Sequence, residues 1–145
     1  MPNEKISQLT NGNPAQASDA IPTDRVDISG INVSVTAGSI ASLAAVSVDN
    51  QSASYIAALS DNNNLVTMNT VGASTFTVPT NLSVPFPVGA LLTISQIGAG
   101  QVTLTPASGA VTIHTPATLT TRVQYSTVSL AQIAPNVWLA AGDLT

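Results

Sequence analysis

The chain has 145 residues, of which 44% are hydrophobic and 7% charged, with a net charge of −4 and no cysteine. This composition allows one domain with a real core and excludes disulfides, thiolate catalysis and cysteine metal sites. Roughly 25% of residues are charged in ordinary soluble domains, so we expect other protein chains to cover much of this neutral surface.

The N-terminal segment, residues 1–30, is expected to be an extended arm. It holds most of the charges and is rich in Pro, Gly, Asn and Asp, which oppose a regular helix or central strand. Scattered apolar residues suit docking on another protein, and a disordered terminus is the alternative. The candidate docking residues of the arm are Ile6, Leu9, Ile21, Pro22 and Arg25.

Residues 31–53 are expected to link the arm to the body. Residues 31–35 alternate apolar and polar side chains, which predicts a strand. Thr36 stands where a helix N-cap would be, ahead of a short helix over residues 37–45 with Ile40 and Leu43 on one face. A helix of this length needs tertiary contacts to be stable.

Residues 54–145 are expected to form an all-β body, a sandwich or jelly-roll-like domain. Thr, Val and Ile dominate its short apolar runs, which turn signals separate at intervals of about ten residues. In residues 101–105, for example, Val102 and Leu104 alternate with polar residues, so one side of the strand faces the core. The predicted strands are 55–59, 65–69, 75–78, 91–97, 101–105, 111–114, 122–133 and 138–141.

The turn residues predict how these strands connect. Asp61 opens a run of three asparagines that predicts a turn, and residues 79–87 hold three prolines that predict a loop. The segments 98–100, 107–109 and 134–136 are each predicted to close a tight hairpin.

Side chains that could carry chemistry are scarce. His114 is the single histidine, and its place on a predicted strand favours a solvated or interface position over a trimeric metal site. Beyond residues 1–30, Asp49, Asp61 and Asp143 are the only carboxylates that could meet in a hydrolytic cleft, although Asp49 and Asp61 have turn-forming neighbours. Trp138 is expected to be a core residue or an intersubunit contact. No catalytic, cofactor or metal site is therefore predicted.

Binding to nucleic acid or to a membrane is not expected either. The cations Lys5, Arg25 and Arg122 are too few and too scattered to hold a phosphate backbone. No apolar run is long enough for a membrane span, and no signal peptide is evident, so we expect synthesis in a host cytoplasm.

Two stretches of the chain carry recognisable motifs. The first runs from Ile6-Ser7-Gln8-Leu9 through Asn13-Pro14-Ala15 to Arg25 and is followed by Val35-Thr36-Ala37-Gly38-Ser39-Ile40-Ala41-Ser42-Leu43-Ala44. The second includes Phe86-Pro87-Val88-Gly89, Ile97-Gly98-Ala99-Gly100-Gln101-Val102, Val137-Trp138-Leu139 and Gly142-Asp143-Leu144. The first stretch resembles the opening of tailed-bacteriophage virion proteins, and the second is similar to a β-module at the C-terminal end of such proteins.

The resemblance implies a homotrimeric structural protein of the virion. An arm with one compact domain and no long shaft is similar to a capsid decoration (cement) protein or head fibre, whose partners are its own copies and the major capsid protein. The alternative is a tail fibre or tail adaptor that takes part in host adsorption. A glycan-degrading enzyme that uses Asp49, Asp61 or Asp143 is the remaining hypothesis.

Overall fold

The structure is a computed structural model that describes residues 20–26, 32–36 and 45–145. The chain divides into two units, residues 1–45 and 46–145. In the first unit, strand β1 (Ala20–Val26) pairs antiparallel with β2 (Asn32–Thr36), and the register shifts between Pro22 and Val26. The strand predicted over 31–35 is therefore confirmed to within one residue, and the segment predicted as a simple arm contains a strand.

The second unit is all-β. Its strands are β3 (Val48–Gln51), β4 (Tyr55–Ile56), β5 (Leu65–Met68), β6 (Ser74–Val78), β7 (Leu91–Gln96), β8 (Val102–Pro106), β9 (Thr112–His114), β10 (Thr127–Ala134) and β11 (Val137–Gly142). A single 3-10 turn, η2 (Leu59–Asp61), is the helical element among the described residues. The strands fall in two sheets, one six-stranded in the order β3-β5-β7-β10-β11-β9 and one three-stranded in the order β4-β6-β8.

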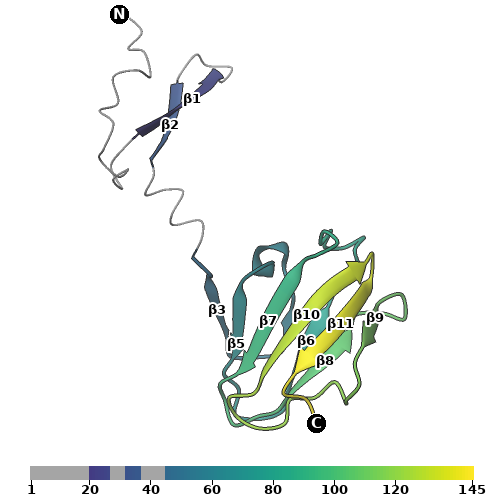
Figure 1. Ribbon diagram of the computed structural model, residues 1–145. Coiled ribbons are helices and arrows are strands. Elements are labelled where there is room, and N and C mark those ends of the chain that lie inside the picture. Colours follow the sequence, from purple (N-terminus) through teal and green to yellow (C-terminus); the bar gives the residue numbers. More distant parts are fainter. Residues whose placement is uncertain (1–19, 27–31, 37–44) are drawn as a thin grey trace, which may run out of the picture. The chain divides into compact units, whose positions relative to one another are not determined.

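From β3 to β8 the chain passes back and forth between the two sheets. The odd-numbered strands β3, β5 and β7 lie side by side in the six-stranded sheet, and β4, β6 and β8 form the three-stranded sheet behind it (Figure 1). All pairings within this region are parallel. The segment is thus a short parallel β-solenoid, called the coil below, in which each turn contributes one strand to each sheet.

Successive turns of the coil are in close contact at their corners. The corner after β7 lies against the corner after β5, where the Gly98 N–H donates to Met68 O at 3.0 Å and the Gly100 N–H to Thr70 O at 2.9 Å. A Cβ atom on Gly98 would overlap the backbone of Thr70, and one on Gly100 would overlap that of Gly72. Glycine is required at both positions because two backbones approach each other there.

After β8 the chain closes the far end of the coil. Residues 118–121 run antiparallel along the free edge of β8, with the Leu104 N–H donating to Leu119 O at 2.7 Å. Strands β10 and β11 then form an antiparallel hairpin beside β7, and β9 pairs parallel with β11.

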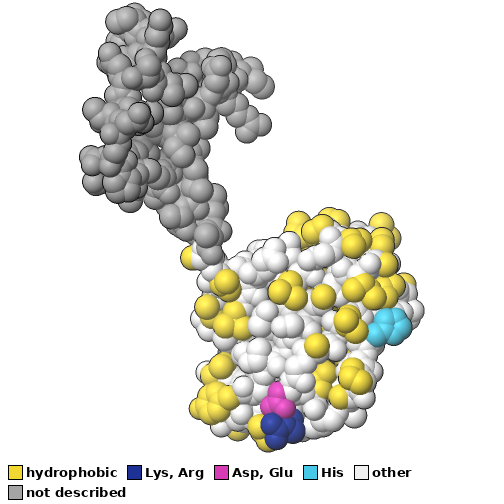
Figure 2. Space-filling view, in the orientation of Figure 1, with side chains coloured by type: hydrophobic (Ala, Val, Ile, Leu, Met, Phe, Trp, Pro, Cys, Tyr) yellow, Lys and Arg dark blue, Asp and Glu magenta, His cyan; other side chains and the backbone are white. Residues whose placement is uncertain are grey.

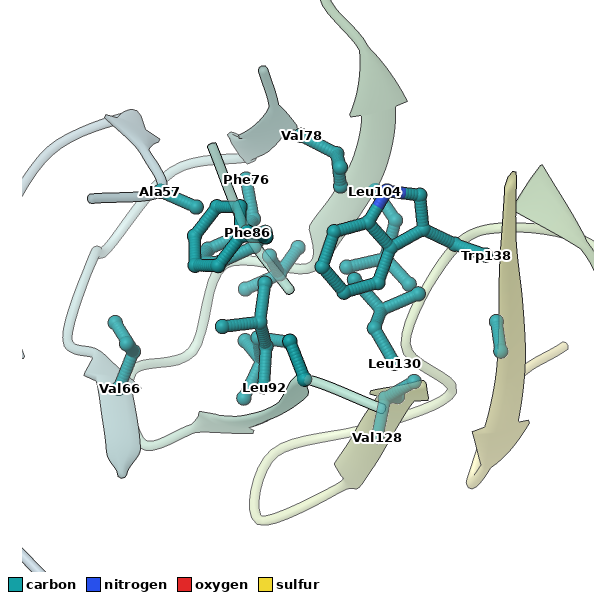
Figure 3. Packing of buried hydrophobic residues seen from close by; sticks show 14 of the residues in the cluster. Ala57, Val66, Phe76, Val78, Phe86, Leu92, Leu104, Val128, Leu130 and Trp138 are labelled. Carbon is teal, nitrogen blue, oxygen red and sulfur yellow. The ribbon is translucent and has the colours of Figure 1, made fainter. Parts of the chain in front are cut away.

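Both sheets contribute to one buried core. Inward side chains of the coil meet those of the hairpin, and the largest is Trp138, whose ring contacts Phe86 edge-on at 5.5 Å between centroids (Figure 3). Burial of a large apolar side chain stabilises a fold by about 1.5–3 kcal/mol. The fully buried apolar residues come from every long strand and include Val66, Met68, Phe76, Val78, Leu92, Ile94, Val102, Leu104, Val128, Leu130 and Trp138.

Most strand predictions are confirmed to within one or two residues, but two of the three predicted hairpins are wrong. Residues 98–100 connect β7 of the six-stranded sheet to β8 of the three-stranded sheet, and residues 107–109 lead from β8 back to β9 of the six-stranded sheet. The strands on either side of each segment therefore do not pair with each other. The hairpin at 134–136 is confirmed, with Asn136 at φ 62°. Alternation of side chains has the same period in parallel and antiparallel strands, so the sequence pattern did not distinguish a crossover from a hairpin.

Other differences concern the ends of elements. The strand predicted over 122–133 begins at Thr127, because residues 122–126 form a turn with Tyr125 at φ 70°. Strand β3 was not predicted at all, since Asp49-Asn50 was interpreted as a turn. It begins within the predicted 31–53 linker and belongs to the second unit. The helix predicted over 37–45 lies, except for its last residue, outside the described residues.

Candidate interaction surface

The sequence of the body, residues 46–145, holds four charged side chains, those of Asp49, Asp61, Arg122 and Asp143. Arg122 and Asp143 neutralise each other in a two-pronged ion pair, with Nε–Oδ1 at 2.7 Å and Nη2–Oδ2 at 3.1 Å. The Ser126 hydroxyl also donates to Asp143 Oδ2 at 2.7 Å. Hydrogen bonds from Arg122 and then from Ser126 lower the pKa of Asp143, so this pair stays ionised at neutral pH.

Asp61 is buried and acts as an internal acceptor. Its Oδ2 accepts hydrogen bonds from the Ala58 N–H at 2.7 Å and from the Tyr55 hydroxyl at 3.1 Å. Burial, and then the carboxylates of Asp61 and Asp49, raise the pKa of Tyr55 above its ordinary value. The phenol therefore stays protonated and keeps its hydrogen bond to Asp61. The turn predicted at Asp61 is confirmed by η2.

Asp49 and Asp61 line one hollow, of about 280 Å³, beside the first turn of the coil. Asp49 accepts from Gln51 Nε2 at 2.8 Å, and the remaining lining comes from Ser47, Val48, Ser60 and Asn64. Of the three carboxylates considered for hydrolysis, these two are brought together, whereas Asp143 pairs with Arg122 outside this hollow. In the part of the chain that the structure describes, no three metal-ligating side chains form a group.

The strands of the six-stranded sheet present no charged side chain outward; the Arg122–Asp143 ion pair lies just past the end of β11, at one margin of the outer face (Figure 2). Strand pairing aligns the outward residues in three rows that cross the sheet. One row is polar and two are largely apolar or small, and together they span the sheet from β3 to β9. The rows are Asn50-Thr67-Ser95-Thr127, Val48-Leu65-Thr93-Ser129-Ala141 and Leu91-Ala131-Leu139-His114.

Side chains in the polar row satisfy one another. Thr67 Oγ1 donates to Asn50 Oδ1 at 2.6 Å, and the hydroxyls of Ser95 and Thr127 lie 2.6 Å apart. Leu91 and Leu139 in the apolar row are 40% and 46% exposed. A face of this kind offers apolar area and few unmet hydrogen-bonding groups, as the centre of a protein interface does.

The outer face of the three-stranded sheet differs because it presents hydroxyls. Thr75 and Thr77 of β6 pair in register with Thr103 and Thr105 of β8. The exposed Ile56 of β4 lies beside Thr77 at the edge of this face. This second face is also neutral, but it is more polar than the face of the six-stranded sheet.

The predicted docking residues are only partly placed by the structure. Ile6 and Leu9 lie outside the described residues, and Ile21, Pro22 and Arg25 lie in β1. Trp138 has no exposed surface, so of its two expected roles the fold gives it the core position and leaves it unable to contact a partner. His114 is exposed at the edge strand β9, the solvated position expected for it.

The outer face of the six-stranded sheet, called the interaction face from here on, was not predicted from the sequence, although the sequence contains signals for it. Several outward residues occupy the polar position of an alternating strand, as Thr93 does between Leu92 and Ile94. What the sequence did not contain was the order of the strands, which alone places Thr67, Ser95 and Thr127 next to one another.

No family model, no curated protein and no solved structure matches this chain. Within the described ranges, the structure has no helix long and apolar enough to cross a membrane.

Proposed function

We propose that this chain is a non-enzymatic structural subunit that works by binding other proteins through the neutral outer face of its six-stranded sheet. The observation that carries this proposal is the outer face of the six-stranded sheet, whose strands present no charged side chain outward. At the margin of this face, Arg122 and Asp143 neutralise each other. A free monomer normally keeps a charged coat for solubility. A face that becomes buried in an interface binds more favourably when it has no charged side chains, because a buried charge without a partner is costly.

The arrangement of the remaining charges supports the same proposal. Asp61 is internal, and Arg122 pairs with Asp143, so the few charges of the body are largely used within the fold. The interaction face combines apolar leucines with hydroxyls already bonded to each other, a mixture that can be desolvated at low cost. We also propose that the two sheets form a β-sandwich, because their inner faces share one core.

In its most specific form, the subunit is a homotrimeric decoration (cement) or head-fibre protein of a tailed bacteriophage. It would bind the major capsid protein on the surface of the virion and add binding free energy to the shell, without any reaction. This form rests on the resemblance of the two sequence stretches, and the neutral interaction face is what such a role requires.

Cryo-electron microscopy of phage particles purified from cells that make this chain tests the proposal directly. We expect trimers at regular positions over the head, with the face of the six-stranded sheet covered. Density confined to the tail vertex would refute decoration and favour a fibre or adaptor role in host adsorption. Absence of the chain from purified particles would refute a virion role altogether.

Two matched variants test which face makes the contact. Leu139→Lys places a charge in the apolar row of the six-stranded sheet, and Ile56→Lys places one on the outer face of the three-stranded sheet. Both replace an exposed aliphatic side chain, so their effects on folding should be similar. We expect Leu139→Lys to weaken binding to shells at least tenfold and Ile56→Lys to leave it unchanged; equal effects would refute the assignment of the face.

The hollow that holds Asp49 and Asp61 favours one other candidate function, hydrolysis of a glycan by two carboxylates. The variants Asp49→Asn and Asp61→Asn distinguish the two proposals. A structural subunit would keep its binding to particles, and infectivity would be unchanged in Asp49→Asn, whose side chain is not part of the core. Loss of infectivity in Asp49→Asn with normal particle assembly would favour the enzyme.

A further inference from the structure

Strand β3, in the first turn of the coil, is an edge strand of the six-stranded sheet, and among the described residues no strand pairs with its outer side. In the parallel pairing of β3 with β5, Ser47 O accepts from the Leu65 N–H at 2.9 Å and Gln51 O accepts from the Asn69 N–H at 2.7 Å. Backbone groups alternate along a strand, so the N–H and C=O of Val48 and Asn50 point away from β5. Within the described residues these groups have no hydrogen-bond partner.

The other sheet edges are short or covered. Residues 118–121 cover β8, and Thr145 is hydrogen-bonded in turn to residues 118 and 120. Strand β4 has two residues and β9 has three, whereas β3 has four. Natural sheets protect an open edge with charged residues, proline, a bulge or a very short strand. β3 has no lysine, proline or bulge, and its one charge, Asp49, is in register with the buried Val66 and so does not lie on the outer face. Val46, two residues before β3, and Val48, its first residue, have side chains that are 63% and 54% exposed.

We propose that β3 is a self-association edge, at which β3 of a second copy adds antiparallel and joins the two six-stranded sheets into one. The second copy is the chosen occupant because the edge is self-complementary. Val48 and Asn50 are neutral, each offers both a donor and an acceptor, and an antiparallel pair of identical strands matches them across a twofold axis. This inference does not depend on the proposed function.

Electrostatics and apolar contact select the register of the pairing. A twofold axis at Asp49 would place two carboxylates directly opposite each other, which destabilises a strand pair. An axis at Val48 places the two valines opposite each other, Asn50 opposite the second copy's Val46, and Asp49 opposite the second copy's Ser47. The geometry therefore favours the axis at Val48, which also covers the two exposed valines.

The pairing has a consequence for stoichiometry. An isologous contact consumes both edges at once, so it closes and does not propagate into fibres. It joins chains in twos, and a trimer would offer three such edges, each of which joins one edge of another trimer. Assemblies at saturating concentration should therefore contain an even number of chains.

The test uses the full-length chain with a charge-swap design. In sedimentation velocity, Val48→Lys alone and Val48→Glu alone should each associate at least tenfold more weakly than the unmodified chain, because like charges then face each other. An equimolar mixture of the two variants should recover the association. Val71→Lys is the matched control, since Val71 is 92% exposed on the corner after β5, and it should associate normally.

Hydrogen exchange of the unmodified chain gives a second readout that needs no variant. The amides of Val48 and Asn50 should exchange rapidly at low concentration and become protected as the chain associates. The proposal is overturned if these amides stay rapidly exchanging in the associated state, if the mixture associates no better than either variant, or if the assembly holds an odd number of chains.

Discussion

The stacking of coil corners can be tested by adding one methyl group at Gly98. In Gly98→Ala the new Cβ would overlap the backbone N, C and O atoms of Thr70, closer than real Cβ atoms approach a neighbour. These atoms belong to the backbone of a stacked corner, so they cannot turn aside as a flexible side chain would. The two corners must move apart, and the hydrogen bonds that join them must lengthen.

The cost can be estimated from the bonds involved. Overpacking of a tight site costs about 1–3 kcal/mol. The corner bonds from the Gly98 N–H at 3.0 Å and the Gly100 N–H at 2.9 Å each contribute about 0.5–1.5 kcal/mol. We therefore expect Gly98→Ala to lower the free energy of unfolding by about 2–6 kcal/mol, a large part of the ~5–15 kcal/mol of a typical domain.

Gly109→Ala is the control, because a Cβ there meets no atom within 4 Å. Urea unfolding monitored by circular dichroism should give a clear loss for Gly98→Ala and a change within about 0.5 kcal/mol for Gly109→Ala, as is usual for open surface sites. If the two variants had equal stability, the parallel coil would be refuted at this corner, and the hairpin predicted from the sequence would again be tenable there.

Three further predictions follow from the buried and charged groups. The pKa of Tyr55 is raised above its ordinary value of 10.0, so the contribution of Tyr55 to stability is complete below pH 10 and is lost as the pH rises further. In urea unfolding, the free energy of unfolding of Tyr55→Phe should therefore fall less above pH 10 than that of the unmodified chain. The pKa of Asp143 is lowered from 3.8, so its contribution to stability is present above that pH and is lost on acidification. Arg122→Gln should reduce the fall in thermal stability at acidic pH, and an unchanged fall would contradict the ion pair. Trp138 should emit at short wavelength and resist iodide quenching until the protein unfolds, and Trp138→Ala should cost about 3–5 kcal/mol, whereas ready quenching in the native state would contradict its burial.

The sequence by itself determined the class of the fold and the positions of most strands. Alternation at Val102 and Leu104 and the turn at Asp61 are local signals, and they predicted where β8 and the η2 turn lie. Composition also revealed that charge is scarce, which is the basis of the proposed function. Strand β3 escaped prediction because its segment, Val-Asp-Asn-Gln, has weak strand propensity and is held by its pairing with β5.

Only the tertiary structure decided which strands are neighbours. The segment 98–100 connects two alternating runs equally well as a hairpin or as a crossover, and the contact of its glycines with the corner after β5 selects the crossover. That choice leaves β7 to pair with β5 and β10, which places Thr67, Ser95 and Thr127 in one row. The parallel pairing of β3 with β5 likewise places Asp49 and Asp61 in the lining of one hollow. Such neighbours are far apart in sequence, and a local pattern carries no information about them because the pairing energy comes from contacts that exist only after the chain has folded.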